Sequence, residues 1–492
     1  MPKSLRYTPA LYQINTRIWL RNLSAKFKRV ISLGNIPDSE IDQLANHGFE
    51  WIWLLGVWRT GEIGRQIALT NPDLQQDYLE ALPDFKEDDV CSSPFAITGY
   101  SVSPDLGGNN GLAILRKKLN SRGIKLMLDF IPNHTARDHP WISLHPDYYL
   151  QGTEDQLKQQ PFNYGRRPEG DLIFAFGRDP YFPGWSDTFQ LNYGNPELQK
   201  AMRKELINVA GFCDGVRCDM AMLLLPDVFR HTWGVEIDPF WLKAISEVKS
   251  RYSEFTLMAE VYWDLEWELQ QQGFDYTYDK RLYDRLLQHE ARPIREHLMA
   301  GLEFQNKSAR FLENHDEPRA AKSFPLEVHE AAAIITYLTP GLKFFHQGQL
   351  RGYLKQIPMQ ICRPPREIPD LELADYYKQL LEILRLPVLQ IGNWQLLDCI
   401  PAWGSNWTWD NFIAFAWGDF KENSLLIVIN YAPHQGQCYV QLPGVDFQGK
   451  DILLEDVIHG IKYERSGDDL TQYGLFLDMP AWGFHVFEVI GQ

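Results

Sequence analysis

The sequence predicts an α/β protein built on a (β/α)8 barrel. Short, nearly continuous apolar runs recur along the chain, and amphipathic segments lie between them. Apolar runs of this kind are typical of parallel strands that helices cover on both faces. Eight such runs are present, which is the number that a barrel of this type requires.

Each of the eight runs has the length of a strand and is followed by a loop. In order they are LYQIN (11–15), FEWIWLLGV (49–57), KLMLDFIPN (125–133), GVRCDM (215–220), FTLMAEVYW (255–263), FDYTYD (274–279), ARFLENHD (309–316) and LKFFHQG (342–348). Amphipathic segments at 39–48, 112–123 and 196–212 are predicted to be helices, because their apolar residues recur at the spacing of one helix face. Strands and helices therefore alternate along the chain.

Two stretches depart from this alternation. Residues 135–185 are rich in Pro, Gly and aromatic residues, and a loop of that length is usually functional or forms a subdomain. After residue 395, runs such as NFIAFAWG and GFHVFEVIG have a strand pattern and are separated by turn residues. We therefore predict a barrel over 1–134 and 186–394, an inserted domain over 135–185, and a C-terminal β-sandwich over 395–492.

Composition narrows the possible partners. The net charge is −16 and no long basic run occurs, which argues against nucleic acid or an anionic membrane as a partner. Aromatic residues make up 13% of the chain. A large core would account for them, but aromatic faces also stack on flat sugar rings, so the composition favours a neutral carbohydrate substrate.

The expected location is the cytoplasm. Six cysteines without a CxxC pair are typical of free thiols in a reducing compartment. The first 20 residues contain no apolar run long enough for a signal-peptide core, and no segment approaches the ~18 apolar residues of a membrane span. The sequence leaves the oligomeric state open.

Arg217 and Asp219 are two charged residues within one apolar strand, CDGVRCDMAM (213–222). Side chains two apart on a strand point to the same face, so the two should lie side by side. Burying them requires that they pair. Two interpretations are open: a structural ion pair, or a working carboxylate that the arginine keeps ionised.

Acidic residues also end other predicted strands. In a (β/α)8 barrel the chemistry lies at the carboxyl ends of the strands. Asp219, Glu260 and Asp316 occupy such positions, and His134 and His315 lie next to two of these strand ends. Carboxylates that meet at one mouth repel each other, so a fold keeps them only with cationic partners or for a function. Their positions favour a catalytic site.

The pattern of acids indicates glycoside hydrolysis. The sequence has no HExxH, no CxxC, no His/Asp set at metal-ligand spacing, no GxSxG and no P-loop. Glycoside hydrolysis needs a pair of carboxyl groups, one acting as acid and the other as nucleophile or base. Arg217 would keep Asp219 ionised, whereas the apolar neighbours of Glu260 in the sequence would help it hold a proton.

Four motifs resemble those of the α-amylase family of retaining glycoside hydrolases. They are DFIPNH (129–134), DGVRCD (214–219), MAEVYW (258–263) and FLENHD (311–316), in the family's order and on strands three, four, five and seven. The segments GYSVSPDLGG (99–108) and PGLKFFHQGQLRG (340–352) are similar to further family segments. The insertion falls where the family's B domain lies, and the β-rich tail where its C domain lies.

The resemblance implies a role for each matching residue. Asp219 would be the nucleophile, Glu260 the general acid/base and Asp316 the stabiliser of the transition state. A simpler account remains for two positions, since His134 could be a core histidine and Asp316 a helix N-cap. The residues expected to bind substrate are Arg217, His134, His315, Tyr262 and a stacking aromatic, either Phe95 or Tyr100.

Departures from the family pattern concern the substrate and the metal. Met222 and Leu223 stand where many endo-acting members carry Lys and His, which predicts a less polar acceptor side. Asn133 matches a calcium ligand of the family, but Gln190 stands where an acidic ligand would be expected. We therefore expect no required cofactor, and a structural calcium is disfavoured.

The sequence predicts a retaining hydrolase acting on α-1,4-glucans or malto-oligosaccharides through a covalent β-glycosyl-enzyme. A glucanotransferase, a glycosyl phosphorylase or an isomerising synthase would share this intermediate and differ only in the acceptor. A non-catalytic glucan-binding relative is the third possibility, and the three acids argue against it. Linkage preference and endo or exo action are left open.

Overall fold

The computed structural model describes residues 8–167, 170–420, 424–444 and 447–491. Eight strands form a closed barrel in the order β1-β15-β14-β13-β12-β11-β5-β2. Their bounds are β1 Ala10–Asn15, β2 Trp51–Leu55, β5 Lys125–Phe130, β11 Gly215–Cys218, β12 Thr256–Ala259, β13 Tyr276–Tyr278, β14 Ser308–Arg310 and β15 Leu342–His346. The predicted barrel is confirmed, with each strand at its expected place.

Several strands end earlier than the sequence pattern indicates. The run at 309–316 is a strand only to Arg310, and the chain then turns through the acidic segment. The run at 215–220 ends at Cys218, and Met220 has a left-handed backbone conformation with φ 45°. An apolar run in the sequence indicates that its residues are buried, but hydrogen-bonded strand pairing ends where the backbone turns. The apolar pattern therefore overstates the length of these strands.

By its contacts the chain divides into two compact units. The first unit comprises 11–278 and 355–367, and the second comprises 1–10, 279–354 and 368–492. Both units contribute strands to the barrel, so they do not coincide with the predicted domains, whose boundaries stay predictions.

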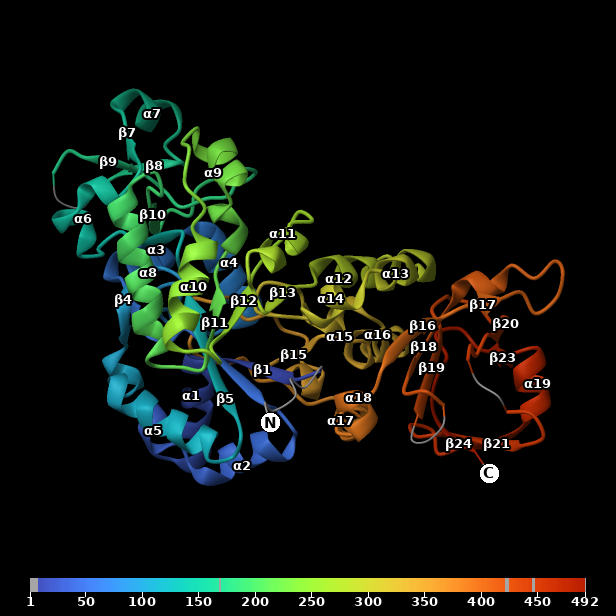
Figure 1. Ribbon diagram of the computed structural model, residues 1–492. Helices are drawn as coiled ribbons and strands as arrows, with labels where there is room; N and C mark the ends of the chain where they lie inside the picture. The colour runs from blue at the N-terminus through green and yellow to red at the C-terminus, as the bar shows by residue number, and fades with distance from the viewer. Residues whose placement is uncertain (1–7, 168–169, 421–423, 445–446, 492) are drawn as a thin grey trace. The chain divides into compact units, whose positions relative to one another are not determined.

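Helices cover the strands of the first unit. Figure 1 shows α5 beside β5, with α2 against α5, and α8 beside α10. The helices of this unit outside the insertion are α1 Thr16–Phe27, α2 Asp38–Asn46, α3 Glu62–Thr70, α4 Pro72–Ala81, α5 Gly108–Asn120, α8 Pro196–Ala210, α9 Pro226–Trp233, α10 Trp241–Arg251 and α11 Glu266–Gln271. The three predicted helices correspond to α2, α5 and α8. Among the described residues, no helix is both long and apolar enough to cross a membrane.

The insertion after β5 is a small β-rich region of the first unit (Figure 1). It contains a three-stranded sheet, β7-β9-β8, and an antiparallel pair, β6 with β10. The elements are β6 His134–Ala136, α6 Trp141–Leu144, β7 Gln151–Gly152, α7 Glu154–Gln159, β8 Tyr164–Arg166, β9 Ile173–Ala175 and β10 Thr188–Gln190. A further antiparallel pair joins β3 Trp58–Thr60 and β4 Ile97–Val102.

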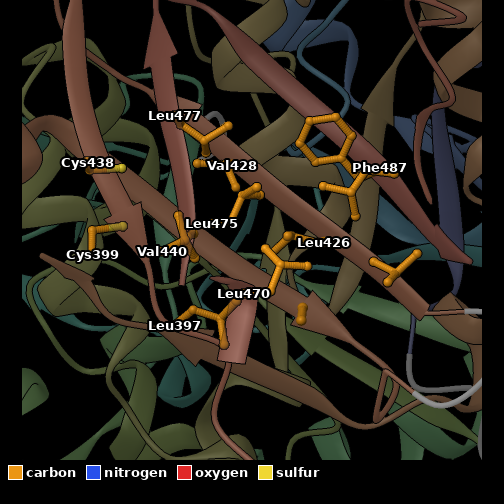
Figure 2. Packing of buried hydrophobic residues seen from close by; sticks show 14 of the residues in the cluster. Leu397, Cys399, Leu426, Val428, Cys438, Val440, Leu470, Leu475, Leu477 and Phe487 are labelled. Atoms are coloured by element: carbon orange, nitrogen blue, oxygen red, sulfur yellow. The ribbon is translucent and has the colours of Figure 1, made fainter. Parts of the chain in front are cut away.

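The second unit carries the predicted C-terminal sandwich. A six-stranded sheet, β16-β18-β19-β24-β21-β22, and a three-stranded sheet, β17-β20-β23, enclose an apolar core. Figure 2 shows side chains from both sheets in this core, together with the free thiols of Cys399 and Cys438. The strands are β16 Trp394–Leu397, β17 Cys399–Ile400, β18 Phe412–Trp417, β19 Ser424–Asn430, β20 Gly436–Val440, β21 Asp451–Asp456, β22 Lys462–Ser466, β23 Leu475–Met479 and β24 Phe484–Gly491.

The remaining helices also belong to the second unit. They are α12 Lys280–Leu287, α13 Ala291–Leu298, α14 Leu302–Asn306, α15 Ala320–Ser323, α16 Leu326–Leu338, α17 Leu371–Ile383, α18 Pro387–Ile391 and α19 Gly467–Gln472. Of these, α16 is buried along most of its length, in keeping with its apolar sequence LEVHEAAAIITYL.

Candidate active site

Arg217 and Asp219 form the ion pair that their spacing predicts. Both lie at the end of β11, and Arg217 Nη1 is 2.5 Å from Asp219 Oδ1. Arg217 is 1% exposed and Asp219 is 4% exposed. A buried pair this close is charge-assisted and holds both side chains in one orientation.

The same guanidinium group reaches a second acid on the neighbouring strand. Arg217 Nη2 is 2.7 Å from Glu260 Oε2, just after the end of β12. The backbone N–H of Met220 donates to Glu260 Oε2 at 2.7 Å, and the Tyr262 hydroxyl donates to Oε1 at 2.9 Å. The apolar surroundings inferred for Glu260 from its sequence neighbours are therefore wrong, because strand pairing brings polar donors to it.

A third carboxylate, that of Asp129 on β5, lies behind this pair. Its Oδ1 is 3.9 Å from Arg217 Nη1 and accepts a hydrogen bond from Trp53 Nε1 at 3.1 Å, and its Oδ2 accepts the backbone N–H of Gly56 at 3.2 Å. Burial raises the pKa of Asp129 from 3.8 to about 7, although Arg217 opposes the shift. When Asp129 is protonated, the charge of Arg217 serves Asp219 and Glu260. Sequence reasoning quoted Asp129 within a motif but missed this role.

We expect Asp129 to make stability depend on pH. Its folded-state pKa lies above the unfolded value, so its stabilising contribution is full below about pH 4 and is lost as the pH rises to about 7. Asp129→Asn should remove this dependence, which amounts to on the order of 4 kcal/mol in the free energy of unfolding. Urea unfolding from pH 4 to pH 8 measures it. Asp227→Asn, at an exposed position, should keep the wild-type slope, and an unchanged slope in Asp129→Asn would contradict the prediction.

His134 and Phe95 border the same carboxylates. His134 Nε2 is 4.0 Å from Asp219 Oδ2, and burial lowers the pKa of His134 to about 3, so its imidazole is neutral at neutral pH. The Phe95 ring lies 5.1 Å from the Arg217 guanidinium carbon. Tyr100 is the alternative stacking aromatic. Its hydroxyl donates to the backbone oxygen of Ile131 and accepts the backbone N–H of the same residue. Of the two candidate stacking aromatics, Phe95 is therefore the one that lies against Arg217.

The backbone is strained directly after Asp219 and again a few residues after Glu260. Met220 has φ 45°, and Trp263 and Asp264 have φ 65° and 63°, a region that non-glycine residues rarely occupy. Such strain is concentrated at functional sites. Trp263 is 37% exposed, and its ring meets that of Tyr181 from the insertion, edge to face, at 5.0 Å. Sequence reasoning missed this aromatic pair, because Tyr181 is 82 positions earlier in the chain.

Met222 and Leu223, the two positions expected to make the acceptor side less polar, are both buried in the short helix η5 Ala221–Leu224. Their side chains therefore belong to the apolar core of the segment that follows Asp219.

In the second unit, His315 and Asp316 form a pair of their own. His315 Nε2 is 3.1 Å from Asp316 Oδ2, and the Asp316 side chain is 35% exposed. Helix α15 begins only at Ala320, and the Asn314 side chain accepts the backbone N–H of Asp316, so the N-cap alternative for Asp316 is excluded. Arg319, three positions further along the chain, contacts Glu313 at 2.6 Å.

A protein-family model, the α-amylase catalytic domain, matches residues 95–372, more than half of the 492 residues. The chain belongs to the α-amylase family. The match covers the strand ends that carry Arg217, Asp219, Glu260 and Asp316, so the resemblance seen in the four motifs is confirmed.

Curated relatives of this α-amylase family member are about a quarter identical to it over the segments that align. It is 27% identical to alpha-amylase 3 of Dictyoglomus thermophilum over 55% of this chain and 56% of that protein. It is 25% identical to alpha-amylase MalA of Haloarcula japonica over 51% of this chain and 35% of that protein. It is 23% identical to an oligo-1,6-glucosidase of Parageobacillus thermoglucosidasius over 60% of this chain and 62% of that protein. The matches thus span about a third to three fifths of these relatives.

Solved α-amylase structures share the fold over nearly the whole chain. A noncanonic maltogenic alpha-amylase, AmyB, from Thermotoga neapolitana has a TM-score of 0.70 at 17% identity, covering 98% of this chain and 99% of that one. An alpha-amylase from Lactobacillus plantarum has a TM-score of 0.66 at 19% identity, with 98% and 99% covered. At these identities the likeness establishes the fold.

The calcium position implied by the α-amylase resemblance contains an amide. Gln190 Nε2 donates to Asn133 O at 3.0 Å, Asn133 Oδ1 at 2.9 Å and Leu191 O at 3.1 Å. All three residues are buried. The three carbonyl oxygens that could bind a cation therefore already accept hydrogen bonds from Gln190 Nε2. Calcium needs several oxygen ligands, preferably charged, so these residues do not fit it.

Proposed function

We propose that this α-amylase family protein is a retaining glycoside hydrolase that cleaves α-1,4-linked glucans or malto-oligosaccharides. The observation that carries the proposal is the bridging of Asp219 and Glu260 by the Arg217 guanidinium. Retaining enzymes hold their two carboxyl groups about 5–5.5 Å apart, close enough for one to attack the sugar directly. One small planar group in contact with both acids favours that spacing over the wider one that leaves room for a water.

Each acid has a distinct task in the proposed reaction. Glu260 protonates the glycosidic oxygen while Asp219 Oδ attacks the anomeric carbon, so that the bond to the leaving sugar breaks and a β-glycosyl ester forms. The ester carries no charge, so Arg217 then acts on Glu260 alone and favours its ionised form. Ionised Glu260 takes a proton from water, which attacks the anomeric carbon and releases an α-product.

Other polar groups are assigned to the substrate. Asp316 is proposed to stabilise the oxocarbenium-like transition state, and His134 and His315 to bind hydroxyls of the sugar that is cleaved. The neutral imidazole of His134 can donate or accept a hydrogen bond without adding charge beside Asp219. Phe95 and Tyr262 would line the same subsite.

The acceptor decides between hydrolysis and its alternatives. The relatives include a protein named trehalose synthase/amylase and one named maltosyltransferase, so transfer is tested directly. Incubation with maltotriose should give only shorter sugars, first as the α-anomer by NMR, and added phosphate should give no sugar phosphate. Longer products would indicate a transferase, a sugar phosphate a phosphorylase, and an initial β-anomer an inverting enzyme.

We also propose that the Gln190 amide replaces a structural calcium ion. Wild-type thermal stability should therefore not respond to EDTA or to millimolar calcium. Gln190→Glu places a carboxylate against three carbonyl oxygens, so the variant should have a lower melting temperature than the wild type without calcium. Added calcium should restore that melting temperature. Thermal unfolding with and without calcium measures both effects. Gln199→Glu, another buried glutamine bonded to backbone carbonyls, should be destabilised regardless of calcium.

A further inference from the structure

Three side chains with metal-binding atoms meet at one end of the six-stranded sheet in the second unit. Asp456 is the last residue of β21, His459 follows in the turn three positions later, and His485 lies in β24. Strands β21 and β24 pair with Asp456 opposite Phe487, which brings His485 to the carboxylate. No His/Asp set was expected from sequence spacing. Spacing along one segment does not reveal this set, because strand pairing supplies His485 from 26 positions beyond His459.

The carboxylate is buried and held in place by the backbone. Asp456 is 0% exposed, and its Oδ1 accepts the backbone N–H groups of Ile458 at 3.0 Å and His459 at 3.1 Å. Its other oxygen, Oδ2, lies 2.8 Å from His459 Nδ1 and 2.6 Å from His485 Nδ1. Two imidazole nitrogens are therefore directed at one carboxylate oxygen, and the three ligand atoms lie within 4.8 Å of one another.

The two imidazole rings are also held by packing. The His485 ring stacks on Phe487, with 4.7 Å between centroids and 18° between planes, and the His459 ring lies 5.3 Å from Phe484. Their side chains are 20% and 42% exposed, so both imidazole rings are partly open to solvent. A ligand set ordered in advance loses little conformational entropy on binding.

We propose that Asp456, His459 and His485 form a binding site for a divalent transition metal such as Zn²⁺. Two imidazole nitrogens and one carboxylate oxygen are a donor set that suits zinc, copper and nickel, whereas magnesium and calcium prefer oxygen alone. With metal–ligand bonds of about 2.0–2.1 Å, the ligand atoms need to be about 3.3 Å apart. The nitrogens of His459 and His485 would thus move away from Oδ2 by about 0.5 and about 0.7 Å, and water would complete the coordination.

The metal would join β21, the turn after it and β24 in one cross-link. The bound metal would stabilise the sheet. This proposal is independent of the proposed glucan hydrolysis. Because the cluster already makes hydrogen bonds, the sheet can also fold without metal. The competing account, in which the three residues form a hydrogen-bonded triad that binds no ion, makes the opposite predictions.

The test is metal binding by the full-length protein without an affinity tag and after removal of bound metal. Calorimetry should show one Zn²⁺ per chain, and Zn²⁺ but not Mg²⁺ should raise the melting temperature. Co²⁺ should give the visible absorption bands of a nitrogen- and oxygen-ligated ion. Imidazole ¹⁵N NMR of the wild-type protein should show His459 and His485 shifting together with Zn²⁺, which needs no variant.

Variants separate this site from other histidines. His459→Gln, at a partly exposed position, should weaken Zn²⁺ binding by more than the roughly 10–100-fold that loss of an outer-shell partner costs. His485→Gln should do the same. His434→Gln, an exposed histidine of the same unit outside the cluster, should bind Zn²⁺ like the wild type. Absence of Zn²⁺ binding, or binding that survives both substitutions, would overturn the proposal.

Discussion

Asp219→Asn is expected to abolish glucan hydrolysis while leaving the fold intact. Asparagine keeps the shape of the side chain but cannot form the glycosyl ester, so kcat should fall by at least about ten-thousandfold, the scale seen when a covalent nucleophile is removed. Reducing-sugar release from maltotriose measures the loss. Asp214→Asn, on the same segment but paired with Arg116, should keep activity within about tenfold.

Chemical rescue distinguishes the nucleophile from the acid/base. With α-maltosyl fluoride, Asp219→Ala leaves space on the β face, so azide can attack the anomeric carbon as fluoride leaves and give β-maltosyl azide. In Glu260→Ala the ester still forms through Asp219, and azide then displaces it to give the α-azide. Exchanged anomers would exchange the two roles, and full activity of Asp219→Asn on any glucan would refute the mechanism.

Arg217→Lys should cause the second-largest loss, in both catalysis and stability. A lysine ammonium holds its three donors on one nitrogen at the end of a flexible chain, so it cannot reproduce the rigid planar fork by which Nη1 contacts Asp219 and Nη2 contacts Glu260. Leaving a buried carboxylate without its partner costs about 3–5 kcal/mol. We expect kcat to fall at least about a hundredfold, a scale typical of lost electrostatic preorganisation. Urea unfolding and maltotriose kinetics measure the two effects.

The matched control is Arg230→Lys. Arg230 pairs with Asp227 on the surface, with 53% and 89% of the two side chains exposed, where an ion pair contributes about 0–1 kcal/mol. Its substitution should change neither kcat nor stability measurably. If Arg217→Lys behaved in the same way, the two carboxylates would not depend on the guanidinium, and the argument for a bridged pair would fail.

The barrel and its acidic strand ends could be predicted because both depend on residue patterns within single short segments of the sequence. A strand buried on both faces has to be apolar along its length, so each of the eight runs was visible by itself. Asp219 beside Arg217 follows from a spacing of two within one strand, and the structure confirms that contact. The role of Asp316 stays a prediction.

What only the tertiary structure decided are the contacts between strands. Glu260 has apolar neighbours in the sequence, yet it contacts Arg217 and accepts the backbone N–H of Met220 because β12 pairs with β11. The amide of Gln190 meets Asn133 across 57 positions, and His485 reaches Asp456 across 29. The sequence by itself determined which residues are buried and which acids end strands, since burial and side-chain direction follow from spacing along one segment. Which polar groups face each other depends on how distant segments pair, and residue spacing within one segment does not predict that pairing.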